Sequence, residues 1–82
     1  MEREYKSLAA AIVIQAAKDY YNALYWLKKN KDADHDGAAW RHKNAMKLDC
    51  ELFFRSHWCK QLTDIPGEKM IKTIRKRVML KE

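Results

Sequence analysis

Apolar residues in the first third of the chain recur at helical spacing. Steps of three and four residues separate the members of a first apolar line: Tyr5, Ala9, Ile12, Ala16, Tyr20, Ala23 and Leu27. A second line runs beside it: Val13, Ala17, Tyr21 and Leu24. This period is that of one face of an α-helix, and the alanines add intrinsic helix propensity. The pattern predicts a long helix over residues 4–30 whose apolar face is wide enough to contact more than one neighbour.

The middle of the chain predicts a second helix, over residues 38–61. A polar break at residues 30–37 precedes it, and Asp34 or Asp36 in that break is a suitable N-cap. Two apolar lines lie on opposite sides of this helix. One contains Ala45, Leu48, Leu52 and Cys59, and the other contains Met46, Cys50, Phe53 and His57. Two opposed lines favour a helix that packs between two partners.

A third helix is predicted over residues 67–80. It follows a turn in which Pro66 suits the first helical position. Its apolar line contains Met70, Ile71, Ile74 and Val78. The sequence therefore predicts a single all-α domain, residues 1–82, with three helices. A chain this short buries only about 60% of the surface of its unfolded form, and nine aromatic residues exceed what three helices hide easily. We therefore expect a homo-oligomer, either a dimer or a larger helical bundle.

The net positive charge lies in the second half of the chain. Residues 1–36 are neutral overall, whereas residues 37–82 contain eleven Lys and Arg against five Asp and Glu, which accounts for the net charge of +6. A one-sided positive field attracts phosphates, anionic lipid or an acidic protein. The alternative is a protein with a generic positive surface.

Cations and aromatic rings alternate along this basic half. The candidate polyanion-binding residues are Arg41, Lys47, Arg55, Lys60, Lys72, Arg75, Lys76 and Arg77. The candidate stacking or interface residues are Trp40, Trp58 and Phe54. Stacking combined with cationic contacts is how proteins hold nucleic-acid bases without reading sequence. The alternative is that the rings pack in the core or in an oligomer interface and the cations surround them.

Metal sites have weak support in this sequence. Residues 32–37 match the opening of a calcium-binding EF-hand loop, but the twelfth position of that loop is Lys43 where a glutamate is required. We expect a solvated acidic loop, and whether it binds calcium weakly stays open. Cys50, Cys59 and the histidines lack the spacing of a zinc site. We expect neither a metal nor a cofactor.

Catalysis and disulfide formation also have weak support. Cys50 and His57 would converge only if their helix bent, so we expect a protein that is not an enzyme. If Cys50 and Cys59 share one helix, they lie about 13 Å apart, which is too far for a disulfide. Free thiols favour a cytoplasmic protein. The apolar run at residues 8–17 is too short to span a bilayer, so no membrane partner is expected.

Three segments resemble a known group of proteins. The first is Asp49-Cys50-Glu51-x-Phe53-Phe54-Arg55-Ser56-x-Trp58, the second is Leu62-Thr63-Asp64-Ile65-x-Gly67-Glu68-x-x-Ile71, and the third is Ile12–Ala16 with Asp19-Tyr20 and Ala23-Leu24. They resemble small uncharacterised helical proteins that phages, prophages and related mobile elements of Gram-positive bacteria encode. Pro66 departs from this pattern, because the group tends to have an acidic residue there. The resemblance implies an accessory viral protein of the bacterial cytoplasm: a host-defence antagonist or a regulator.

Together these observations favour a non-catalytic phage-type accessory protein that captures a polyanionic partner. The partner would be nucleic acid, a nucleotide signal or a nucleic-acid-bound host defence protein, which makes the chain a candidate host-defence antagonist. One alternative is an oligomeric structural or protein-interaction module. Another is a phage transcriptional regulator that binds DNA, although residues 67–70 are poorly suited to read base edges.

Overall fold

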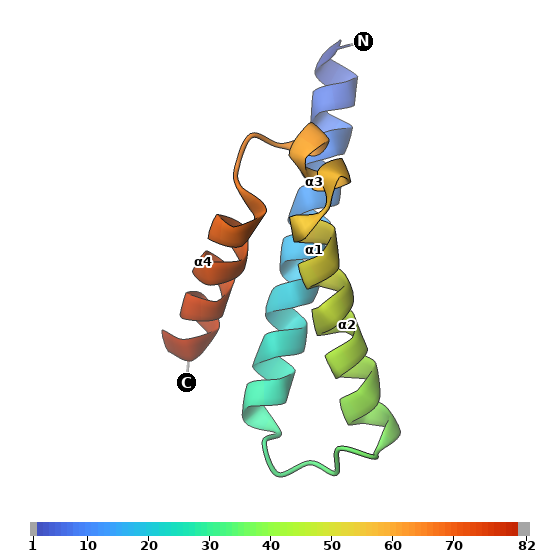
Figure 1. Cartoon of the computed structure of the whole chain (residues 1–82), viewed down its shortest axis with the longest axis vertical. Helices are drawn as coiled ribbons and strands as arrows, with labels where there is room; N and C mark the ends of the chain where they lie inside the picture. Colours follow the sequence, from blue (N-terminus) through green and yellow to red (C-terminus); the bar gives the residue numbers. More distant parts are fainter. Residues whose placement is uncertain (1, 81–82) are drawn as a thin grey trace.

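The computed structural model describes the backbone of residues 2–80 and the side chains of residues 8–80. Four helices follow one another along the chain. They are α1 (Glu2–Lys29), α2 (Ala38–Arg55), α3 (His57–Leu62) and α4 (Gly67–Leu80). Every regular element in this described part is helical, which confirms the all-α prediction. In Figure 1, α1 and α2 form an antiparallel hairpin, and α4 runs in the same direction as α1.

The prediction of three helices is wrong, because Ser56 divides the predicted helix 38–61 into α2 and α3. Ser56 has an extended backbone, with φ −77° and ψ 156°. Its hydroxyl accepts a hydrogen bond from the Cys59 amide at 3.2 Å and donates one to the Phe53 carbonyl at 2.6 Å. The same side chain therefore satisfies the C-terminus of α2 and caps the N-terminus of α3.

The loop between α1 and α2 also differs from the prediction. Gly37 is the N-cap of α2, so neither Asp34 nor Asp36 caps the helix with its side chain. The Asp34 carboxylate instead accepts a hydrogen bond from the Asp36 amide at 3.0 Å, which closes an Asx turn within the loop. At the start of the loop, the Asn30 side chain donates to the Trp26 carbonyl at 2.8 Å and satisfies the last turn of α1.

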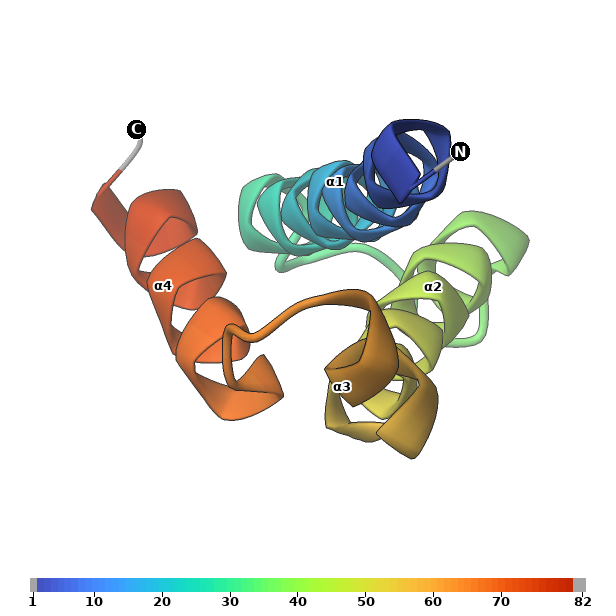
Figure 2. The ribbon, with the colours of Figure 1, turned by 90° about the horizontal axis from the view of Figure 1, so that it is seen from above.

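The centre of the core takes one side chain from each helix. Tyr20 of α1, Phe54 of α2, Cys59 of α3 and Ile71 of α4 are each at most 1% exposed. The rings of Tyr20 and Phe54 meet edge to face, with centroids 5.8 Å apart. This small cluster joins α4 to the α1–α2 hairpin. Figure 2 shows α4 beside that hairpin.

Both ends of α4 are fixed against neighbouring helices. At its N-terminus, Gly67 is buried against the backbone of Phe54 in α2. At its C-terminus, the Lys28 ammonium of α1 donates to the carbonyls of Val78 and Met79 at 2.8 and 3.1 Å. A cation at this position also stabilises the negative end of the helix dipole. These contacts at both termini therefore determine which side of α4 faces outward.

Candidate ligand-binding surfaces

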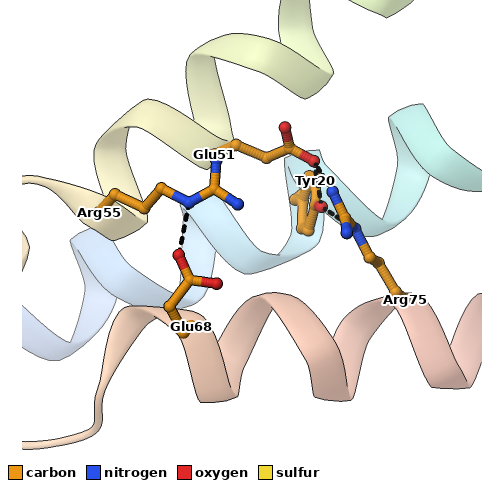
Figure 3. A network of polar contacts seen from close by, with 5 residues as sticks. All are labelled: Tyr20, Glu51, Arg55, Glu68 and Arg75. Carbon is orange, nitrogen blue, oxygen red and sulfur yellow. Dashed lines mark hydrogen bonds and ion pairs between the residues drawn. The ribbon is translucent and has the colours of Figure 1, made fainter.

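A polar network joins the three long helices beside the core (Figure 3). The Tyr20 hydroxyl of α1 donates to the Glu51 carboxylate of α2 at 2.6 Å. Arg75 of α4 donates to the Tyr20 hydroxyl at 3.0 Å and to the same Glu51 oxygen at 2.5 Å. Glu51 is 6% exposed, so its charge is stable only because both partners reach it. The network holds α4 in register against the hairpin.

The ionisation of Tyr20 and Glu51 reflects this arrangement. Burial and the neighbouring Glu51 carboxylate raise the pKa of Tyr20 to about 12. Burial alone would raise the pKa of Glu51, but hydrogen bonds from Tyr20 and Arg75 outweigh it and lower the Glu51 pKa below its ordinary value. The hydrogen bond to Glu51 raises the pKa of Arg75. At neutral pH the network therefore consists of a neutral Tyr20 phenol and the ion pair between Glu51 and Arg75.

Replacing Tyr20 with phenylalanine tests this network by its pH dependence. The folded protein holds the Tyr20 proton more tightly than the unfolded chain, whose tyrosine titrates near pH 10, so this contribution is complete below about pH 10 and is lost towards pH 12. Between about pH 9 and pH 12, we expect the free energy of unfolding of the wild type to fall by about 2 kcal/mol more than that of Tyr20→Phe. Urea unfolding across this range measures the difference. Parallel pH profiles for the two proteins would contradict the assignment.

A second ion pair crosses from α2 to α4 nearer the start of α4. Arg55 donates to the Glu68 carboxylate at 2.5 Å (Figure 3), and this bond raises the pKa of Arg55. Both side chains are about half exposed, so the pair contributes little to stability. The two ion pairs matter more for function, because Arg55 and Arg75, both predicted to bind a polyanion, already have carboxylate partners.

Three lysines form what we call the cationic ridge of α4: Lys69, Lys72 and Lys76. All three are exposed, and they form no ion pair within the part of the chain whose side chains are described. Their spacing of three and four residues places them on one side of the helix, away from Ile71 and Val78. Lys69 was missing from the predicted binding residues, although its spacing from Lys72 is the signal that identifies it.

The remaining predicted cations lie elsewhere. Arg77 is exposed, one residue beyond the ridge, on the side of α4 that meets α1. Arg41 and Lys60 are exposed on α2 and α3. Lys47 is half-buried, and its charge contributes to the lowered pKa of Glu51. The eight predicted cations are therefore distributed over several sides, and Lys72 and Lys76 are the pair that the fold presents together on one exposed side.

The three predicted ring residues do not form one stacking surface. Phe54 is 1% exposed and packs against Tyr20 and Phe53, so its assignment as a stacking or interface residue is wrong. Its position on α2 points to the core, because that side also carries Glu51. Trp40 is half-buried and stacks on His35 with ring centroids 4.2 Å apart. Trp58 is 57% exposed on α3, whereas Trp40 lies in the first turn of α2. Figure 1 shows α3 at the end of the α1–α2 hairpin opposite the loop that precedes α2.

The thiols and the acidic loop offer little reactive chemistry. Burial and the charge of Asp19 raise the pKa of Cys50 to about 11, and burial raises that of Cys59. Both thiols are therefore protonated at neutral pH, which makes them poor nucleophiles and poor metal ligands. Among the residues described, no three His, Cys, Asp or Glu side chains converge in a way that would hold a metal ion.

An open groove runs between α1 and the segment from α3 to α4. Three cavities of about 660, 340 and 410 Å³ compose it. They share lining residues, so they form one continuous surface: Ile14 belongs to the first and third, Ile65 to the first and second, and Ala17 to the second and third. We call this surface the α1–α4 groove. Ile14 and Ile65 are 53% and 52% exposed, so the groove is apolar and open to solvent.

Comparisons with known proteins give no relative for this chain: no family model, no curated protein and no solved structure matches it. Within residues 2–80, no helix combines the length and the apolar character needed to cross a bilayer. The surfaces described above are therefore the basis for any functional assignment.

Proposed function

We propose that this protein is a non-catalytic accessory protein, of the phage-encoded kind that residues 49–58 and 62–71 resemble, and that it binds a nucleic acid through the cationic ridge of α4. Such binding would let it act as a host-defence antagonist in the bacterial cytoplasm. The single observation that supports this function is the group of three exposed lysines, Lys69, Lys72 and Lys76, on one side of a fixed helix.

The ion pairs of α2 and α4 strengthen the field of this ridge. Glu51 of α2 and Glu68 of α4 each already have an arginine partner, Arg75 and Arg55. These two carboxylates therefore do not pair with the lysines of the ridge. From Lys69 to Lys76 the helix rises about 10 Å, which spans about three phosphates of one strand of a double helix at about 3.4 Å per nucleotide.

This kind of contact does not read sequence. Lysine ammonium groups bind phosphate as point charges, and Trp58 lies on α3 rather than on α4, so stacking adds little at the ridge. Affinity then depends on released counterions and falls steeply with salt. With three phosphates neutralised, we expect the logarithm of the association constant to fall with the logarithm of salt with a slope of about −2 to −3.

A pair of charge-reversed double variants tests the ridge. Lys72→Glu with Lys76→Glu changes the ridge, and Arg41→Glu with Lys60→Glu changes net charge equally elsewhere. We expect the ridge variant to bind a fluorescent single-stranded oligonucleotide at least about tenfold more weakly than the wild type. The slope of its salt dependence should also become shallower, by the amount that corresponds to the loss of about two phosphate contacts. The control variant should weaken binding less than about threefold. Fluorescence anisotropy at low and at physiological salt measures both.

Several outcomes would redirect this proposal. Equal losses in the two double variants would mean that net charge, not the ridge, governs binding. If the wild type bound no oligonucleotide at low salt but did bind a cyclic dinucleotide, a nucleotide signal would replace nucleic acid as the ligand. A footprint on one promoter sequence would favour the transcriptional regulator instead.

A second candidate function, an oligomeric interaction module, is favoured by the surface of α2. Leu48 and Leu52 are 47% and 68% exposed and lie one turn apart on this helix. A pair of adjacent exposed leucines is a suitable contact between two copies. Light scattering on the oligonucleotide-binding samples distinguishes the two functions, because a self-association module remains oligomeric when the ridge is reversed.

A further inference from the structure

Apart from Lys69, which also belongs to the cationic ridge, the residues that line the α1–α4 groove take no part in the proposed nucleic-acid binding. On the α1 side its floor includes the small residues Ala9, Ala10 and Ala17. Alanine side chains end close to the helix backbone, so α1 leaves an unfilled channel beside residues 61–65 and α4. Ile14, Ile65 and Ile74 form the apolar walls of this channel. An apolar channel between helices is the geometry that receives an amphipathic helix.

The charges around the groove are arranged unevenly. Lys18, Lys69 and Arg77 line the part between α1 and α4. Asp64 is in the other part, next to α3, together with the uncharged Gln61 and Thr63. Arg77 borders both cavities of the cationic part. A ligand that fills this part of the channel therefore passes between positive side chains from both helices.

We infer that the α1–α4 groove binds an acidic amphipathic helix of a partner protein. Apolar side chains of this helix, three and four residues apart, would lie over Ala17 between Ile14 and Ile74. Its glutamates or aspartates would pair with Lys18, Lys69 and Arg77. The groove follows α1 from Ala9 to Asn22, a rise of about 20 Å, which corresponds to a bound helix of about 13 residues.

The charges favour an acidic helix over two other occupants, a second copy of the chain and a nucleic acid. A second copy of the chain would bring a net charge of +6 against a positive rim. A nucleic acid would find an aliphatic floor, with Tyr21 as the aromatic ring at one edge. An acidic helix satisfies both features, because its apolar stripe matches the floor and its acidic flanks match the rim.

Two synthetic peptides test the inference. Both have about 16 residues and one leucine stripe; one has glutamates on both flanks, and the other has lysines at the same positions. We expect the glutamate peptide to bind the wild type at least about tenfold more tightly than the lysine peptide. Isothermal titration calorimetry measures both affinities. Equal affinities, or no binding of the glutamate peptide at millimolar concentration, would overturn the inference.

Variants locate the peptide. Ile14→Glu places a charge on the groove wall, and Leu8→Glu makes a similar change at an exposed residue of the same helix that does not line the groove (53% against 62%). We expect Ile14→Glu to weaken binding of the glutamate peptide by at least about tenfold, and Leu8→Glu by less than about twofold. Equal effects of the two variants would overturn the site.

A charge exchange tests the rim even if Ile14→Glu fails to fold. Arg77 is exposed, so Arg77→Glu should leave the fold intact, weaken the glutamate peptide and strengthen the lysine peptide. If Arg77→Glu still preferred the glutamate peptide as strongly as the wild type does, the assignment of Arg77 to the rim of the groove would be contradicted. Light scattering on wild type and Ile14→Glu must show the same mass, since a dimer that Ile14→Glu dissociates would place a second copy in the groove.

Oligonucleotide binding gives an independent readout. Ile14 is not part of the cationic ridge, so Ile14→Glu should change oligonucleotide affinity by less than about threefold. A protein that binds the peptide but no oligonucleotide would lose the proposed function and keep this inference, and the reverse result would do the opposite.

Discussion

Replacing Gly67 with alanine is expected to detach α4 from the rest of the protein. A Cβ atom at this position would lie 1.7 Å from the carbonyl oxygen of Phe54 and 2.6 Å from its carbonyl carbon. The φ angle of Gly67 is not positive, so the glycine is required for the close approach of two backbones and not for its conformational freedom. Because a backbone carbonyl cannot rotate aside as a flexible side chain can, the start of α4 must move.

The energetic cost should be large for a chain of this size. Overpacking against a rigid neighbour costs about 3 kcal/mol or more, while a domain of 82 residues has a free energy of unfolding of about 4 to 12 kcal/mol. Displacing α4 also separates Arg55 from Glu68 and strains the contact of Arg75 with Glu51. We expect Gly67→Ala to unfold at a much lower urea concentration than the wild type, or to lose the cooperative transition.

Gly37→Ala is the matched control. A Cβ atom at Gly37 would lie 3.0 Å from the carbonyl oxygen of Asp34, in an exposed loop that can shift by a few tenths of an ångström. We expect its free energy of unfolding to stay within about 1 kcal/mol of the wild type. Circular dichroism during urea unfolding compares the two variants. Equal stability of Gly67→Ala and Gly37→Ala would show that the α2–α4 contact is looser than described.

The second large effect is expected for Phe54→Ala. This ring is 1% exposed and contacts the rings of Tyr20 and Phe53 with centroids 5.8 and 5.6 Å away. Truncating a buried phenylalanine removes the transfer free energy of the ring and leaves a cavity, at a cost of about 3–5 kcal/mol. The loss falls at the point where α1 and α2 meet α4, so the network of Tyr20, Glu51 and Arg75 should loosen as well.

Trp58→Ala provides the contrast within the same sequence segment. Its indole is 57% exposed, and we expect the free energy of unfolding to change by less than about 1 kcal/mol. Urea unfolding followed by circular dichroism serves for both variants, because it does not depend on tryptophan fluorescence. If Trp58→Ala destabilised the monomer as much as Phe54→Ala, the assignment of Phe54 to the core and Trp58 to the surface would be wrong.

Local patterns were sufficient for the type of secondary structure. Period and propensity predicted helices throughout, and α4 occupies the predicted range 67–80. The break at Ser56 was missed because the apolar lines of the predicted helix continue across it. The available signal was the serine itself, whose hydroxyl competes with the helix backbone and favours an N-cap. One side chain therefore changed the number of helices without disturbing the apolar pattern.

The surfaces were harder to predict because they depend on contacts between distant residues. Tyr20, Glu51 and Arg75 come from three helices, and no local pattern pairs them. From sequence alone, Arg55 and Arg75 were predicted to be cations available to a ligand, whereas in the fold each forms an ion pair with a glutamate from another helix. The alanines of the α1–α4 groove were likewise interpreted only as helix formers, although Ala9 leaves space beside residues 61–65 and Ala17 leaves space beside α4. Lys69 was within reach of sequence reasoning, since it continues the spacing of Lys72 and Lys76.

Nuclear magnetic resonance mapping of an oligonucleotide titration tests the proposed function most directly. Backbone amide shifts are recorded as a short single strand is added to the isotopically labelled protein at low salt. We expect the largest changes along the exposed side of α4, at Lys69, Lys72 and Lys76, and their disappearance at high salt. Largest changes on α2 and α3 around Arg41 and Lys60, with α4 unperturbed, would contradict the cationic ridge as the binding surface.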